Sequence, residues 1–120
     1  MITDSYDSLS EAIITPASFL GEQNKICDIA IATFSREIYP AVLERFPNEK
    51  IGEIRAANRI KPIYLLTVNN MRIAFYLSEI GAALSSTDII EVNWMTEAEK
   101  FIVFGSAGAL DKEKTAGKYV

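Results

Sequence analysis

The sequence predicts a single α/β domain. Four apolar residues at 101–104 (FIVF) form a run that is typical of a strand buried on both faces. Small residues follow at 105–108 (GSAG), where two glycines allow a sharp turn and a close approach of a ligand to the backbone. A segment of helical period, 81–95, precedes this strand. Because ligands bind at the carboxyl ends of strands in open α/β sheets, a functional site is expected at 105–108.

Composition restricts the functions that are open to this chain. Its 120 residues are 49% apolar and 23% charged, an ordinary globular balance that is sufficient for one domain over 1–120. A net charge of −4 without a basic cluster argues against a nucleic-acid partner. No apolar stretch approaches the roughly 20 residues that span a bilayer, so no membrane partner is expected. Cys27 is the only cysteine and histidine is absent, so we expect a cytoplasmic protein without a metal site.

The N-terminal region is polar with scattered apolar patches, and Pro16 and Gly21 interrupt it. We expect an extended arm at 1–25 that packs across the domain and forms no helix. Residues 26–33 (ICDIAIAT) are rich in β-branched and small apolar side chains, and they predict the first buried strand.

A helix is predicted after this strand. Ser35 is placed to cap a helix that runs to about Arg45, with Pro47 just beyond its end. Pro40 lies inside the segment and predicts that the helix is short or kinked.

Three strands are predicted in the middle of the chain, at 51–57, 62–68 and 71–77. Asn69 and Asn70 separate the last two, and asparagine tolerates a positive φ angle. The pair therefore predicts a tight hairpin turn.

From Gly81 to about Met95 the pattern becomes helical, because side chains recur at spacings of three and four: Ala83, Leu84, Thr87, Ile90, Glu91 and Trp94. A charged loop is predicted at 111–118, and two β-forming residues end the sequence. We therefore expect the 120 residues to be a piece of a longer protein.

Two turns of small residues follow predicted strands, and both are candidate binding sites. Ser78–Gly81 precedes a helix, whose free N–H groups and partial positive charge favour an anion. In the second turn, Gly105–Gly108, the Ser106 hydroxyl can donate to the same anion or to a sugar hydroxyl. Glu79 would repel an anion unless its side chain points away. The alternative interpretation is that both segments are only tight turns.

Charged residues supply weaker candidates. Arg36 and Glu37 follow the first strand, where ligands often bind, although a solvated first helical turn is the simpler interpretation. Three further arginines are able to clamp phosphate but are expected to be surface charges: Arg55, Arg59 and Arg72.

The order strand, Asn-Asn hairpin, strand, S-x-I-G turn, helix, strand and GSAGAL makes residues 26–120 resemble the N-terminal half of the nucleoside phosphorylase family. This superfamily contains purine and uridine phosphorylases and the methylthioadenosine/S-adenosylhomocysteine nucleosidases. The resemblance implies a three-layer α/β fold around a mixed, partly barrel-like sheet, incomplete at the C-terminus. It also implies cleavage of the N-glycosidic bond of a nucleoside, a homo-oligomer, and no cofactor other than phosphate as co-substrate.

The resemblance assigns two sets of binding residues, one for phosphate or the attacking nucleophile and one for the nucleoside. The first set is Ser106, Gly81 and Arg36, and the second is Ser78, Ala107 and Gly108. Ser106 matches the Ser or Thr that contacts phosphate in the phosphorylases. No catalytic residue is assigned, because the family's other half supplies the glutamate that binds the ribose hydroxyls and the acid that protonates a purine.

Three departures from the family pattern affect these roles. Glu79 replaces the first glycine of the family's S/T-G-I-G turn, and 33–36 (TFSR) lacks the glycines of its phosphate loop. Val103 stands where phosphorylases have a phosphate-binding arginine. The resemblance implies a pentosyltransferase that uses phosphate, and the loss at Val103 favours the alternative, hydrolysis by water. A non-catalytic binding or oligomerisation module is a further alternative, and the isolated chain is expected not to turn over a nucleoside.

Overall fold

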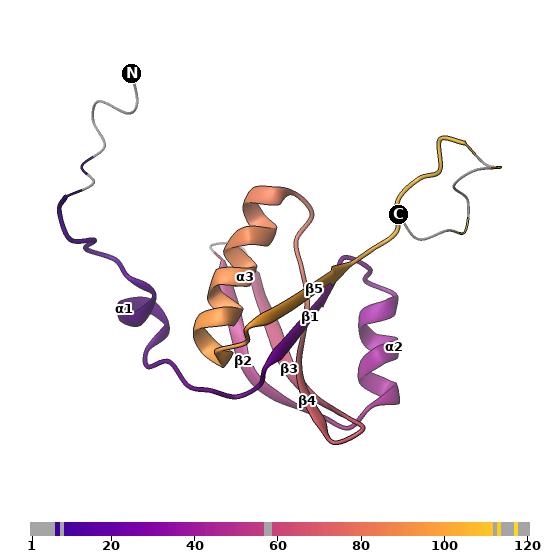
Figure 1. Ribbon diagram of the computed structural model, residues 1–120, viewed down its shortest axis with the longest axis horizontal. Coiled ribbons are helices and arrows are strands. Elements are labelled where there is room, and N and C mark those ends of the chain that lie inside the picture. The colour runs from indigo at the N-terminus through magenta and orange to yellow at the C-terminus, as the bar shows by residue number, and fades with distance from the viewer. Residues whose placement is uncertain (1–6, 8, 57–58, 112, 114–116, 118–120) are drawn as a thin grey trace.

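The computed structural model describes residues 7, 9–56, 59–111, 113 and 117. Its helices and strands follow in the order α1 (Pro16–Leu20), β1 (Ile29–Thr33), α2 (Ile38–Arg45), β2 (Asn48–Ala56), β3 (Arg59–Val68), β4 (Met71–Leu77), α3 (Ala82–Thr96) and β5 (Lys100–Phe104). Figure 1 shows the sheet between α2 and α3, with β5 nearest the viewer.

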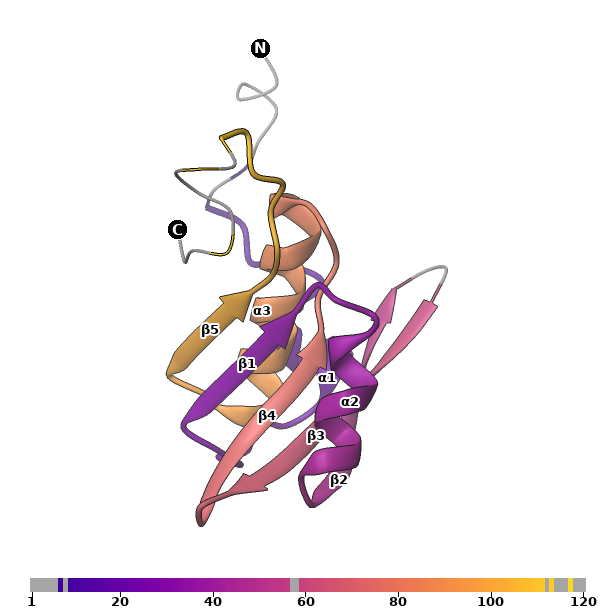
Figure 2. The same ribbon diagram turned by 90° about the vertical axis from the view of Figure 1, so that its right-hand side faces the viewer.

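The sheet is mixed, with strand order β2-β3-β4-β1-β5. β1 pairs in parallel with both β4 and β5, whereas β2, β3 and β4 form an antiparallel meander. The chain therefore crosses from β4 through α3 to β5 and passes over β1, as Figure 2 shows. The predicted α/β class is confirmed, and the parallel strands β4, β1 and β5 end at one common edge.

The two faces of the sheet bury different side chains, because successive residues of a strand point to opposite faces. Phe75 faces α2, where its ring stacks on Tyr39 with centroids 5.4 Å apart. Its neighbour Tyr76 belongs to the core cluster under α3, together with Ile63 and Val92. One face of the sheet thus packs against α2 and the other against α3.

The hairpin between β3 and β4 has the predicted form. β4 occupies 71–77, as the alternation of side chains indicated, and Asn69 and Asn70 have φ angles of 49° and 63°. Two successive positive φ angles define the turn that matches the twist of a two-residue hairpin.

Replacing Asn70 by glycine should raise the free energy of unfolding by up to about 1 kcal/mol, because glycine adopts a positive φ without the steric penalty of a Cβ atom. Asn70→Val should lower it by about 1–2 kcal/mol for the opposite reason. Urea unfolding of the three proteins measures both changes, and equal stabilities would contradict the assigned turn.

The expectation that 1–25 contains no helix is wrong. Pro16 and Gly21, which suggested interruption, are the first residue and the C-cap of α1. The Thr15 hydroxyl accepts the N–H of Ser18, and Ser18 returns a bond to the N–H of Thr15. Proline at the first helical position and glycine after the last are signals that delimit a helix as well as break one.

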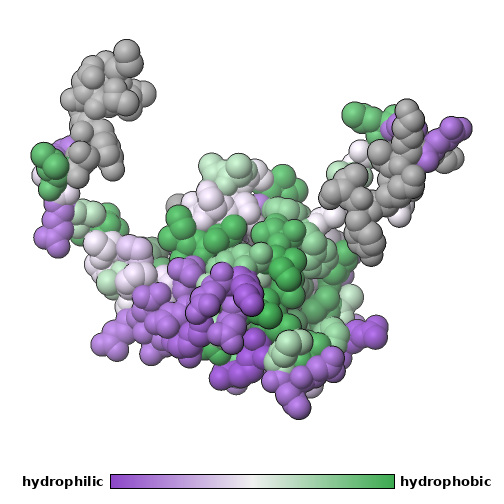
Figure 3. Space-filling model, in the orientation of Figure 1, coloured by the Kyte–Doolittle hydropathy of each residue, from purple (hydrophilic) through white to green (hydrophobic). Residues whose placement is uncertain are grey.

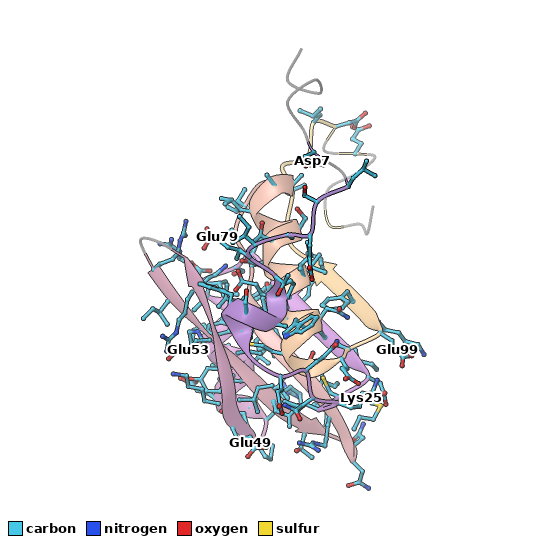
Figure 4. All side chains as sticks on the ribbon, turned by 90° about the vertical axis from the view of Figure 1, so that its left-hand side faces the viewer. Asp7, Lys25, Glu49, Glu53, Glu79 and Glu99 are labelled. Atoms are coloured by element: carbon cyan, nitrogen blue, oxygen red, sulfur yellow. The ribbon has the colours of Figure 1, made fainter. Side chains whose placement is uncertain are left out.

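The first strand is shorter than predicted, since β1 begins at Ile29 rather than at residue 26. The N–H groups of Ile26 and Cys27 donate to the carbonyl of Thr96 at 2.9 and 3.3 Å, so this segment binds the end of α3 instead of a strand. Lys25 adds ion pairs to Asp28 and Glu99 at 2.9 and 3.2 Å; Lys25 and Glu99 lie on the same side in Figure 4.

The expectation that 101–104 is buried on both faces is also wrong. β5 is an edge strand, and Ile102, Val103 and Phe104 are 52, 40 and 38% exposed. The apolar run correctly indicated a strand, but it does not indicate whether the strand lies inside the sheet or at its edge. In Figure 3 apolar side chains gather in the centre of this view, and hydrophilic side chains lie below them.

The helix predicted from residue 81 is α3, but its buried face differs from the apolar pattern. Leu84 and Ile90, which suggested the face, are 50 and 58% exposed. The residues that α3 buries are Asp88, Val92 and Thr96, one turn apart. The pattern was misleading because one of the inward positions holds a charge, which is paired with the sheet as described below.

Candidate functional site

Three loops meet at the edge where the parallel strands end. Thr33, the last residue of β1, is level with Leu77 of β4 and with Phe104 of β5. The loops that follow these strands, 34–37, 78–81 and 105–108, contain all six residues that the sequence assigned to binding. Such an edge is where open α/β sheets bind ligands.

Ser35 lies in the loop after β1, and its hydroxyl accepts hydrogen bonds from the N–H groups of Glu37 and Ile38 at 3.3 and 3.1 Å. Ser35 thus binds the turn that leads into α2, but the N-cap residue of the helix is Glu37, which makes no side-chain capping bond, so the predicted cap lies two residues too early. Arg36 is exposed at the tip of this loop. Pro40 lies in the first turn of α2, where the missing N–H is tolerated, and the helix has eight residues.

The loop after β4 is tied to the rest of the edge. The Ser78 N–H donates to the carbonyl of Thr33 at 2.9 Å, which joins this loop to the end of β1. Ser78 itself is buried, and its hydroxyl donates to Ser85 at 3.1 Å. Gly81 is exposed at the N-cap of α3 with a φ angle of 111°, which a residue with a side chain rarely adopts.

The loop after β5 begins close to the first loop. A Cβ atom at Gly105 would lie 2.9 Å from the Phe34 ring, so this position accepts only glycine without displacement of the ring. Ser106, Ala107 and Gly108 are exposed, and Figure 1 shows the chain continuing beyond the end of the sheet there. Gly105 therefore packs against the loop after β1, whereas the next three residues are exposed to solvent.

A cluster of four charged residues, which the sequence did not reveal, lies beside the loop after β4. We call Arg59, Lys61, Glu79 and Asp88 the buried ionic cluster after its buried pair, Lys61 and Asp88; Arg59 and Glu79 are partly exposed. Lys61 Nζ lies 2.5 Å from Asp88 Oδ2 and 3.6 Å from Glu79 Oε1, while Arg59 Nη1 lies 2.5 Å from Glu79 Oε1. Lys61 and Asp88 are only 7 and 4% exposed.

This cluster determines whether the Glu79 carboxylate is an unpaired negative charge near Gly81. Its carboxylate is held by Arg59 and Lys61, so it does not stand unpaired at Gly81; Figure 4 shows Glu79 next to the start of α3. A signal for the cluster exists in the sequence. Lys61 has the parity of Ile63 and therefore faces the core, and a buried cation requires an acidic partner. Nothing in the sequence, however, identifies Asp88 as that partner.

Glu91 lies next to this cluster. Burial raises the pKa of the Glu91 carboxyl above its usual value of 4.5, and the charge of Asp88 raises it further, whereas the backbone N–H of Arg55 and the charge of Lys61 oppose the increase. Glu91 Oε2 is buried without a hydrogen-bond partner in the described structure. The ionised form of Glu91 is therefore disfavoured in the folded protein.

Glu91→Gln should raise the free energy of unfolding at pH 7 by a few tenths to about 1 kcal/mol. The folded protein binds the Glu91 proton more tightly than the unfolded chain does. This proton binding stabilises the folded wild type at a pH below the pKa of Glu91 in the unfolded chain. The stabilisation is lost as the pH rises through the pKa of Glu91 in the folded protein. The stabilisation of Glu91→Gln relative to the wild type should therefore vanish near pH 4. Thermal melts at both pH values, with the exposed Glu44→Gln as a control, test this; a gain of equal size at both would be inconsistent with it.

Other features lie away from the edge. An open groove of about 600 Å³ runs between α1, β2 and α3, lined by Phe19, Leu20, Lys50, Ile51, Gly52, Glu53, Arg55 and Met95. Among the described residues, no three His, Cys, Asp or Glu side chains are grouped to hold a metal ion. No helix in the same part of the chain has the length and apolar character needed to cross a membrane.

Neither a family model nor a curated protein matches the sequence. Solved structures do resemble the fold. Helicobacter pylori MTAN is 24% identical over 72% of this chain and 38% of its own, with a TM-score of 0.57. Native futalosine hydrolase of Helicobacter pylori strain 26695 is 24% identical over 73% of this chain and 36% of its own, also with a TM-score of 0.57. The chain thus spans little more than a third of the length of these proteins, and the likeness concerns the fold.

Proposed function

We propose that this chain forms the nucleoside-binding part of a hydrolytic nucleosidase, in which water cleaves the N-glycosidic bond. The observation that supports this proposal is the meeting of three loops at the carboxyl edge of β1, β4 and β5. The chain has this arrangement within a fold similar to that of MTAN and of futalosine hydrolase, and the second is by its name a hydrolase.

The charges at this edge favour water over phosphate as the nucleophile. The two cations at the adjoining end of β3, Arg59 and Lys61, are neutralised by the carboxylates of the buried ionic cluster. Val103, at the position of the phosphorylase arginine, is apolar and 40% exposed. A phosphate dianion would thus meet Arg36 as the exposed cation of the described loops, whereas neutral water requires no cation.

In the proposed reaction, the oxygen of water bonds to C1′ of the sugar as the bond from C1′ to the base nitrogen breaks. One proton of the water is released and the base acquires one, so the products are the free base and the free sugar. We assign Ser106 to donate a hydrogen bond to the sugar, and the exposed backbone of Ala107 and Gly108 to line the nucleoside. We expect the isolated 120 residues to bind the nucleoside without releasing the base, because the resemblance assigns the group that protonates the base to the family's other half.

Calorimetry with methylthioadenosine, inosine and uridine, each with and without phosphate, tests this proposal. We expect at least one nucleoside to bind with an affinity that phosphate does not change, and no release of base by the isolated chain. Ser106→Ala should weaken binding about tenfold, the value of one hydrogen bond, and the arm variant Ser10→Ala should not. Absence of binding by all three nucleosides would falsify the proposal, and tighter binding with phosphate would support phosphorolysis.

A second candidate function is a non-catalytic association module. The observation that favours it is the exposed apolar face of β5, the edge strand of the sheet, where Ile102 is 52% exposed. Light scattering after size exclusion would then show a defined oligomer that dissociates in Ile102→Lys. A stable monomer over a range of concentrations would rule this candidate out.

A further inference from the structure

The buried ionic cluster is poorly explained by stability alone. A buried pair such as Lys61 and Asp88 loses hydration energy that its attraction only partly returns, and apolar residues of similar volume are often as stable. Three buried polar atoms of the described residues also lack partners close to the cluster: Arg59 Nε, Tyr76 OH and Glu91 Oε2. Burial and the charge of Asp88 raise the pKa of Tyr76, so this hydroxyl stays protonated. Native proteins tolerate few such atoms, and each calls for an explanation.

The contacts of the cluster converge on one residue of the loop after β4. Asp88 Oδ2 accepts Lys61 Nζ at 2.5 Å and the backbone N–H of Glu79 at 3.0 Å. The carboxylate of Glu79 is bound by Arg59 and Lys61 from β3. Asp88 of α3 therefore binds the backbone of residue 79, and Arg59 and Lys61 of the sheet bind its side chain. Residue 79 lies two positions before Gly81.

We propose that the buried ionic cluster positions the loop 78–81 for the nucleoside, with Lys61 and Asp88 as positioning residues that do not touch the ligand. This inference rests on the proposed function. The cluster spans β3, the loop and α3, so it fixes the loop relative to both the sheet and the helix. Gly81 then keeps its positive φ and its place at the N-cap of α3 when a ligand binds.

The experiment uses the double variant Lys61→Met/Asp88→Leu, which replaces the pair by apolar side chains and should fold. Amide exchange of Glu79, whose N–H loses its acceptor, should accelerate at least tenfold. The amide of Thr67, which donates to Pro47 in a different part of the sheet, serves as an internal reference and should not change. Nucleoside affinity, measured with methylthioadenosine, should fall at least tenfold.

Asp88→Asn keeps an acceptor for the Glu79 N–H and leaves Lys61 with the Glu79 carboxylate at 3.6 Å. It should lose stability, but in the folded protein its Glu79 exchange should stay slower and its affinity higher than in the double variant. Ser86→Ala, on the exposed side of α3, is the control for substitution in the helix. Slow exchange at Glu79 and unchanged affinity in a folded double variant would overturn the inference. If the wild type binds no nucleoside, the proposed function fails, and accelerated exchange still establishes that the cluster holds the loop. Unchanged exchange in that case overturns both.

Discussion

Lys61→Met should lower the free energy of unfolding by about 3–5 kcal/mol, because it leaves the carboxylate of Asp88 buried without its cation. Asp88 is 4% exposed, so solvent cannot replace the lost ammonium group. A domain of this size is stable by about 5–15 kcal/mol, and the variant should therefore be close to unfolding at 37 °C. Urea unfolding followed by circular dichroism measures the loss.

Two further variants make this result specific. Adding Asp88→Leu to Lys61→Met removes the unpaired charge and should recover most of the lost stability, although each protein has lost the same ammonium group. Lys50→Met removes a half-exposed lysine that pairs with Glu53 on the surface, and it should cost less than about 1 kcal/mol. Equal losses for Lys61→Met and Lys50→Met would contradict the burial of the Lys61–Asp88 pair.

Phe75→Ala should lower the free energy of unfolding by about 3–5 kcal/mol, since Phe75 is 2% exposed and its removal leaves a cavity under α2. No residue of α2 is fully buried, and Tyr39 stacks on Phe75 and donates to the carbonyl of Pro62 at 3.1 Å. We therefore expect α2 to lose more protection than β1 does. Urea unfolding measures the total loss, and amide exchange locates it.

Phe19→Ala provides the matched control, because the same side chain is 63% exposed in α1. It should change stability by less than about 1 kcal/mol. A loss of under 1 kcal/mol in Phe75→Ala, or exchange that increases equally in α2 and β1, would show that Phe75 does not anchor the helix.

The elements that the sequence predicted correctly are those with a strong local pattern. The 71–77 strand, the Asn-Asn turn and the helix that starts after Gly81 agree with β4, the hairpin and α3. Each depends on side-chain alternation, on a positive φ or on helical period, which act between residues close in the chain. The errors at Pro16 and Gly21 arose because both residues mark the ends of a helix as readily as a break.

The residues that the sequence assigned to a site lie along one edge of the sheet, and their binding roles stay predictions. The turns after three strands contain the six assigned residues, since the carboxyl ends of parallel strands were expected to bind ligands. Ser78 was assigned to the nucleoside, and the structure buries its hydroxyl against Ser85. The sequence does not indicate the pair of Lys61 and Asp88, because 27 positions separate the two residues.

The sequence by itself determined the α/β class, the order of most elements and the place of two small-residue turns after strands, because these follow from periodicity and from backbone preferences of single residues. Tertiary structure alone decided that β5 is an exposed edge, which face of α3 is buried, and that four charges hold the loop after β4. These features depend on which distant segments become neighbours, and a side chain's environment is set by those neighbours rather than by its own position in the chain.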